Sequence, residues 1–452
     1  MEKARVAFVG FGEVNSPQEL IARKCRAACN ELECQGLELL TTDPVSDDAR
    51  GIGVARALAA LGAGQFDCLV ACIAGWIPSQ AVIEVLAPFR HKPIVLWGLT
   101  GYYQDGRLVT TADQAGTSAL RSVLAELGYT FQFVYNTPDG KSKAPRVAAI
   151  ARAAAAAARL RTARIGMMGY RDMNLYGTMF DGVGLKRALG VEIETFEMLE
   201  IAQIMEKLAP TEVDAVVRGA LSRWTFCKPA AEETLRKGAS YYLAIRKKVE
   251  ERGYQAVSLL DVDGMKKLAG FPPAMVFMLL ADEMGLPTIP ENDSLGAVTQ
   301  LLVNCLTGQI AAYMEFYEFM EDRVLVGVPD YVPAEVVEGP VTVLPASFGG
   351  FSEGVLNVSK VRTGRVTLCR IFARGGLYFL HAVTGEAVTP RSWEEAGWSA
   401  PAPQLPSLEI VLDSSVEDFA QNVMSQHYIV AYGDIREDLR EACSVTGLTL
   451  VG

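Results

Sequence analysis

The chain has 452 residues, of which 50% are hydrophobic and 21% are charged, and its 53 Asp and Glu residues outnumber its 42 Lys and Arg residues. This composition is that of a folded globular protein with two to four domains, and it excludes a disordered chain. The net charge of −11 comes without any basic run, which argues against a nucleic-acid partner because binding phosphates needs concentrated positive charge.

The mean hydropathy of +0.18 is high, yet no stretch of about 18 apolar residues lacks a charge or a turn-forming residue. The apolar run 6–9 near the N-terminus is too short for the core of a signal peptide. We therefore expect no membrane segment and a cytoplasmic location. The nine cysteines include no CxxC pair and no zinc-like spacing with histidine, so we expect reduced thiols.

The first 160 residues alternate between apolar strands and amphipathic helices. The predicted strands are 5–9, 37–40, 68–74 and 93–97, and the predicted helices are 18–32, 53–61, 82–86, 117–127 and 151–160. Such alternation is typical of a parallel sheet covered on both faces, so we expect a flavodoxin- or Rossmann-like α/β domain over residues 1–160. Gly10 and Gly12 follow the first strand without the third glycine of a dinucleotide fingerprint, which favours an ordinary turn.

The same alternation begins again at residue 164. The predicted strands are 164–169, 191–196 and 256–260, and the predicted helices are 182–189, 230–250, 273–284 and 294–306. We expect a second doubly wound α/β domain with a parallel sheet over residues 161–325.

After residue 321 the pattern changes to short strand-like runs separated by Gly and Pro. These runs are 324–328, 341–344, 355–358, 365–372, 377–381, 408–412 and 428–432, with a helix predicted over 435–445. The pattern is typical of antiparallel β structure, so we expect a mainly antiparallel, barrel-like C-terminal domain over residues 326–452.

The segment Pro290-Glu291-Asn292-Asp293-Ser294 lies between a short strand-like run and a helix. In extended backbone, residues i and i+2 point the same way, so Glu291 and Asp293 would converge beyond the end of a strand, where open α/β sheets bind ligands. The alternative is that Asp293 or Ser294 only caps the helix by accepting a backbone N–H.

Several segments resemble the L-fucose isomerase and L-arabinose isomerase superfamily, in family order over nearly the whole chain. Glu291-Asn-Asp-Ser-Leu-Gly-Ala-Val298 resembles the metal-site segment of L-fucose isomerases. Gln426-His-Tyr-Ile-Val-Ala-Tyr-Gly-Asp434 resembles part of the C-terminal domain of the family. Shorter resemblances are found at residues 97–101, 165–176 and 360–370.

The resemblance implies a metal-dependent aldose–ketose isomerase that acts on a sugar through an ene-diol. The family holds its metal with two carboxylates and one histidine, which by position are Asp293, with Glu291 beside it, and His427. Mn²⁺, or another divalent cation such as Mg²⁺ or Co²⁺, suits such oxygen-rich ligands. On this reading, Asp293→Asn stays folded with near-native melting but loses its metal and its activity.

The resemblance also implies a homo-oligomer, a trimer or hexamer, in which the first domain of one subunit covers the metal site of another. The alternative is a carbohydrate-binding or regulatory protein that shares the scaffold without the reaction.

The sequence leaves open which residue supplies the remaining carboxylate of the site. Asp261 and Asp263 both follow the predicted strand 256–260, and their i, i+2 spacing lets them share a side. Lys266 and Lys267 come next, where many relatives carry acidic or neutral polar residues. They form either a solvated first helical turn or a binding site for an anionic group of the substrate, such as a sulfonate or phosphate.

Two further side chains follow predicted parallel strands. Trp76 can stack on a sugar face, or it packs in an interface. Arg171 either contacts the substrate or makes a structural ion pair.

Overall fold

The computed structural model describes residues 3–328, 331–347, 352–393 and 405–452. The contacts divide the chain into two compact units, Met1–Ala158 with Arg440–Thr446, and Arg159–Leu439 with Gly447–Gly452. No helix in these described ranges is both long enough and apolar enough to cross a membrane. The three-domain division expected from the sequence stays a prediction.

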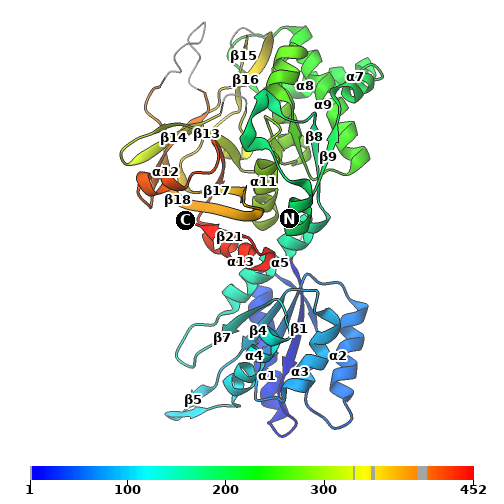
Figure 1. Cartoon of the computed structure of the whole chain (residues 1–452), viewed down its shortest axis with the longest axis vertical. Helices are drawn as coiled ribbons and strands as arrows, with labels where there is room; N and C mark the ends of the chain where they lie inside the picture. Colours follow the sequence, from blue (N-terminus) through cyan, green and yellow to red (C-terminus); the bar gives the residue numbers. More distant parts are fainter. Residues whose placement is uncertain (1–2, 329–330, 348–351, 394–404) are drawn as a thin grey trace. The chain divides into compact units, whose positions relative to one another are not determined.

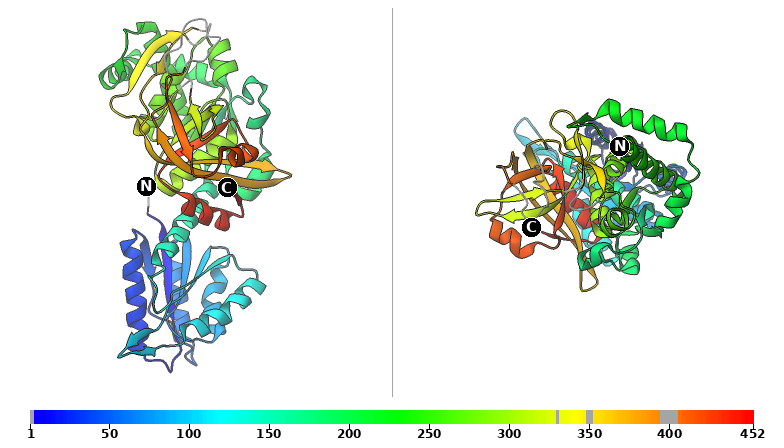
Figure 2. Two further views of the ribbon diagram at one scale, coloured as in Figure 1. Left: turned by 90° about the vertical axis from the view of Figure 1, so that its left-hand side faces the viewer. Right: turned by 90° about the horizontal axis from the view of Figure 1, so that it is seen from above.

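The first unit contains a five-stranded parallel sheet with the order β2-β1-β3-β4-β7, and helices cover both of its faces (Figure 2). This is the flavodoxin-type order of a doubly wound sheet. Its strands are β1 (Arg5–Phe11), β2 (Glu38–Thr41), β3 (Cys68–Ile73), β4 (Ile94–Gly98) and β7 (Phe131–Tyr135). Its helices are α1 (Gln18–Cys34), α2 (Ile52–Ala63), α3 (Ser79–Leu86), α4 (Asp113–Glu126) and α5 (Ala144–Thr162), the last of which runs on into the second unit. A small hairpin of β5 (Tyr102–Gln104) and β6 (Arg107–Val109) precedes α4.

The second unit contains a four-stranded parallel sheet with the order β12-β11-β8-β9. Its strands are β8 (Arg164–Met168), β9 (Glu192–Phe196), β11 (Ala256–Leu259) and β12 (Thr288–Ile289). The helices are α6 (Gly182–Leu189), α7 (Met198–Met205), α8 (Pro210–Arg223), α9 (Glu232–Arg252), α10 (Ala274–Met284) and α11 (Ser294–Thr307). Helices α7 and α8 were not predicted from the sequence, while α6 has the predicted bounds.

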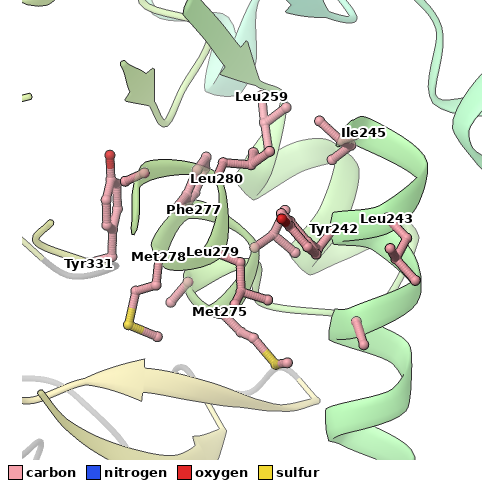
Figure 3. Close-up of a cluster of buried hydrophobic side chains, with 14 of the residues drawn as sticks. Tyr242, Leu243, Ile245, Leu259, Met275, Phe277, Met278, Leu279, Leu280 and Tyr331 are labelled. Atoms are coloured by element: carbon pink, nitrogen blue, oxygen red, sulfur yellow. The ribbon is translucent and has the colours of Figure 1, made fainter. Parts of the chain in front are cut away.

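A large apolar core fixes the end of β11, from which the candidate site begins. Figure 3 shows Leu259, the last residue of β11, among side chains of α9 and α10 that include Tyr242, Ile245 and Leu280. Burying side chains of this size is worth about 1.5–3 kcal/mol each. The backbone that follows Leu259 is therefore held firmly.

The C-terminal strands close into an antiparallel barrel. The sheet order is β17-β20-β13-β14-β19-β18, and β17 also pairs with β18, which closes the barrel. Figure 1 labels β13, β14, β17 and β18. The strands are β13 (Ala312–Phe319), β14 (Arg323–Gly327), β17 (Gly364–Arg374), β18 (Leu377–Val388), β19 (Ser407–Leu412) and β20 (His427–Tyr432). Gly375 and Gly376, with φ of +61° and +77°, form the two-residue turn of the long β17–β18 hairpin, because that type of turn needs positive φ at both positions.

Strand β21 (Thr449–Val451) pairs with β18 in parallel. Helix α12 (Val416–Asn422) belongs to the second unit, whereas most of α13 (Arg436–Thr446) belongs to the first. Two predicted strands, β15 (Thr342–Ser347) and β16 (Glu353–Asn357), are not part of the barrel. They form a separate sheet with β10 (Thr225–Phe226), where β10 pairs with β15 in parallel. The sequence pattern finds such strands but does not show their partner.

A buried histidine in the barrel gives a testable pH dependence. His381 is 1% exposed, its Nδ1 lies 2.7 Å from Tyr428 Oη, and burial lowers the pKa of His381 to about 4. Between pH 6.5 and 4 the unfolded chain therefore binds a proton that the folded chain does not, so stability falls as the pH drops. The loss attributable to His381 reaches roughly 3 kcal/mol.

In His381→Gln, which keeps an acceptor for the tyrosine hydroxyl, this part of the acid sensitivity is expected to disappear. Urea unfolding of the wild type and of His381→Gln at pH 7 and pH 4.5 measures this effect. Acidification costs the wild type more free energy of unfolding, so the difference in stability between the two proteins must shrink at pH 4.5. A constant difference would place the acid sensitivity elsewhere.

Candidate functional site

Three strands of the second parallel sheet end at one edge, where the following loops are tied together. Asn292 Nδ2 donates to the carbonyl of Met168 at 2.7 Å, and Asn292 N donates to the carbonyl of Leu259 at 3.2 Å. The backbone N–H of Glu291 donates to Asp261 Oδ1 at 2.7 Å. Because open α/β sheets bind ligands at the carboxyl ends of their strands, this edge is the candidate site.

The turn after β12 has an unusual backbone. Glu291 and Asn292 have φ of +63° and +51°, a left-handed conformation that costs free energy in residues with a Cβ atom. The extended conformation expected for residues 291–293 is therefore wrong, because the chain turns sharply there. Non-glycine residues held in such conformations cluster at functional sites.

Asp293 is the N-cap of α11 and also half of a buried ion pair. Its Oδ1 accepts from the backbone N–H of Gly296 at 3.0 Å and from Arg370 Nη2 at 2.7 Å. Its Oδ2 accepts from Tyr313 Oη at 2.8 Å and from Arg370 Nη1. Burial alone would raise the pKa of Asp293, but the charge and hydrogen bonds of Arg370 hold it below its ordinary value. Asp293 therefore caps α11, which is the alternative that the sequence left open. It also has a charged partner, Arg370, that was not predicted.

Asp261 opens a π-helix, Asp261–Leu268, and pairs with a lysine inside it. Hydrogen bonds in a π-helix join residues five apart, as from the N–H of Met265 to the carbonyl of Leu260. This spacing puts Asp261 and Lys266 on the same face, with Lys266 Nζ 3.0 Å from Asp261 Oδ2 and both side chains at most 1% exposed. The interpretation of Lys266 as part of a solvated helical turn is wrong.

Asp263 and Lys267 lie on a different side of the same helix. Asp263 Oδ1 accepts from Lys267 Nζ at 2.7 Å, and Asp263 Oδ2 accepts from the backbone N–H of Met173 at 2.8 Å. The hydrogen bond from Lys267 is the main reason that the pKa of Asp263 falls below its ordinary value. Asp261 and Asp263 were expected to share a side, and the π-helix separates them, leaving Asp261 in the buried cluster.

Asp172 is a further buried carboxyl group that sequence reasoning missed. It accepts from the backbone N–H groups of Val262 and Asp263 at 2.8 and 2.7 Å. Burial and the neighbouring charge of Asp261 raise the pKa of Asp172 to about 6. Its position after β8, next to Arg171, was the signal available in the sequence.

His427 lies between two glutamates at the start of β20. Its Nδ1 is 3.7 Å from Glu291 Oε2, and its Nε2 is 3.7 Å from Glu315 Oε2. Its ring stacks on Tyr313 with centroids 4.4 Å apart. Burial lowers the pKa of His427 to about 3, so the imidazole is neutral at physiological pH. The structure thus places His427 next to Glu291, and Glu315 faces it from the neighbouring strand.

The two remaining candidates are placed as follows. Trp76 belongs to the first compact unit and is 39% exposed. Arg171 belongs to the second unit, where its Nη2 donates to Asn174 Oδ1 at 2.9 Å and its guanidinium lies over the ring of Tyr176. A sugar-stacking role for Trp76 and a substrate-binding role for Arg171 stay predictions.

The side chains that the resemblance assigns to a divalent metal do not form an open ligand set here. A carboxylate offers about four lone-pair sites. All four in Asp293 are taken up by Gly296, Tyr313 and the two Arg370 nitrogens. Within the described residues, no three His, Cys, Asp or Glu side chains are arranged to hold a metal ion. The donor set as folded does not fit the family's metal.

The chain resembles sugar isomerases over most of its length. It is 22% identical to the sulfoquinovose isomerase of Priestia megaterium over 80% of each chain. It is 20% identical to the sulfoquinovose isomerase of Alkalicoccus urumqiensis over 79% of this chain and 80% of the relative. It is 24% identical to the L-arabinose isomerase of a Nocardioides species over 74% of this chain and 69% of the relative. No protein-family model matches the chain. The similarity supports a sugar isomerase enzyme, at low identity.

Proposed function

We propose that this protein is a sugar aldose–ketose isomerase. The observation that carries the proposal is the similarity to two kinds of sugar isomerase, over 80% of the chain for one and 74% for the other. A second observation supports it, because acidic side chains and a neutral histidine gather at the sheet edge where ligands bind.

The chemistry moves two protons, one from C2 to C1 through a base and one from O2 to O1. A base takes the C2 proton of the open-chain aldose, and the electron pair moves so that the carbonyl oxygen O1 becomes negative and an ene-diolate forms. The proton on O2 then passes to O1, a carbonyl forms at C2, and the protonated base returns a proton to C1. Every atom and electron pair stays within the sugar and the base, so no external oxidant or reductant enters.

Glu291 is the base that the geometry favours. It is buried, it is held by a strained turn, and its carboxylate faces His427 Nδ1. A neutral imidazole has one donor and one acceptor nitrogen, so His427 can carry the proton from one sugar oxygen to the other.

The test is an assay of ketose formation with L-arabinose, L-fucose and the sulfonated sugar sulfoquinovose, run in D₂O. Conversion with deuterium entering at C1 or C2 supports the proposal. A protein that binds one of these sugars without converting it would instead be a non-isomerising member of the same scaffold.

The proposal has two finer parts, the substrate class and the oligomeric state. Two of the relatives just described are named as isomerases of sulfoquinovose, so we propose an anionic sugar as the substrate. We also propose a homo-oligomer, from the family resemblance, and analytical sedimentation measures the oligomeric state.

Arg171 is the cation that we expect to bind the sulfonate group of the substrate. The residue after it, Asp172, is tied to the loop that follows β11, so Arg171 stands beside the site. A charge-assisted hydrogen bond is worth about 1.5–3 kcal/mol. In Arg171→Gln, kcat/KM for sulfoquinovose is expected to fall roughly 10- to 100-fold. The value for L-arabinose is the internal control and should hold, whereas an equal fall for both sugars would mean a structural role for Arg171.

A further inference from the structure

Two buried cations lie where the family resemblance expects a metal ion. Lys266 pairs with Asp261, and Arg370 pairs with Asp293 through both of its terminal nitrogens. All four side chains are at most 2% exposed. They come from a π-helix, the N-terminus of α11 and the barrel strand β17, so the arrangement is built by the fold rather than by neighbouring residues on one element.

These pairs change the charge balance of the site. In a metal-dependent site the carboxylates are compensated by the divalent ion, which needs their lone pairs. Here the lone pairs of Asp293 accept four hydrogen bonds, and the negative charge of Asp261 faces an ammonium group. A dication placed among them would meet two positive side chains in a region with little water to screen the repulsion.

We propose that Lys266 and Arg370 stand in for the divalent ion. They compensate the two carboxylates, the site takes up no Mn²⁺, and the positive charge that favours a negative oxygen on the substrate comes from side chains. Only the last of these three statements rests on the proposed isomerase function.

Metal content and metal-dependent melting test the inference without any activity assay. The full-length protein is purified after incubation with MnCl₂, its manganese is measured by atomic mass spectrometry, and its melting is followed with and without MnCl₂. We expect manganese far below one ion per chain and no change in melting temperature. Stoichiometric manganese with a higher melting temperature would overturn the inference.

Lys266→Met supplies the second arm, with Lys267→Met as the matched control on the solvent side of the same helix. Lys266→Met leaves the carboxylate of Asp261 uncompensated, so MnCl₂ is expected to raise its melting temperature, while Lys267→Met behaves as the wild type. If Lys266→Met does not respond to Mn²⁺, Lys266 does not occupy the position of a metal charge.

Lys266→Met is tested for folding by far-UV circular dichroism in the presence and absence of MnCl₂. If it folds in neither condition, the double variant Asp261→Asn/Lys266→Met replaces it, because that variant buries no unpaired charge. It is expected to fold and to ignore Mn²⁺, and Mn²⁺ binding by it would overturn the inference.

The activity assay separates this inference from the proposed function. Isomerase activity that survives EDTA supports both. Activity that is lost with EDTA and restored by Mn²⁺ overturns the inference and keeps the function. A complete lack of isomerase activity overturns the function, and the manganese measurements still decide whether the cations replace the ion.

Discussion

Asp293→Asn is expected to lower the free energy of unfolding by about 3–5 kcal/mol, because it leaves the buried guanidinium of Arg370 without its counter-charge. The asparagine still offers an oxygen to the N–H of Gly296, so the loss does not come from the helix cap. Near-native melting was the expectation from the sequence, which gave Asp293 a metal ion or a helix cap as its partner and showed no buried cation beside it. Urea unfolding at pH 7 measures the change.

A double-mutant cycle tells a charge pair from general damage to the site. Arg370→Met alone leaves the carboxylate of Asp293 buried and unpaired, and should cost a similar amount. The double variant Asp293→Asn/Arg370→Met buries no charge, so it is expected to be more stable than either single variant. If the two losses simply add, the ion pair contributes nothing of its own and the interpretation of the site fails.

The α/β architecture follows from hydrophobic periodicity, and its elements could therefore be predicted. Strand β3, fully buried, and helix α11, apolar and bounded by Asp293 and Gly308, have bounds within a residue or so of those predicted. Strand β13 was not predicted, because its second half mixes aromatic and acidic residues and the strand begins only a few residues after α11 ends. Its place in the barrel depends on pairing with β20, more than a hundred residues later, which periodicity does not reveal.

Only part of the candidate site could be predicted from the sequence. Glu291, Asp293 and His427 were found through their motifs, and the structure brings Glu291 and His427 together. The pairing of Asp261 with Lys266 was not visible, since it requires the five-residue spacing of a π-helix where the pattern favoured ordinary helix or extended chain. Arg370 lies 77 residues after Asp293, and only the fold brings the two together.

Glu291→Gln is expected to remove most of the isomerase activity while leaving the fold unchanged. Glutamine has nearly the same shape as glutamate, and the hydrogen bond to Asp261 comes from the backbone N–H of residue 291, which the substitution keeps. The amide cannot accept the C2 proton, and loss of a general base costs about 10²- to 10⁴-fold in rate. Deuterium exchange at C2 of the sugar, followed by NMR in D₂O, should fall by the same factor as kcat.

Glu315→Gln is the matched control, because Glu315 faces the other nitrogen of the same histidine. The two carboxylates lie at equal distances from the ring, 3.7 Å each, but they differ in surroundings. Glu291 sits in a left-handed turn at the edge of the parallel sheet, whereas Glu315 lies opposite His427 on a barrel strand and is partly exposed. The base must meet a sugar at the sheet edge, so it is assigned to Glu291, and Glu315 can only orient the imidazole ring. Glu315→Gln is therefore expected to keep most of the C2 exchange, and if exchange is instead lost with Glu315→Gln and kept with Glu291→Gln, the base has been assigned to the wrong side of His427.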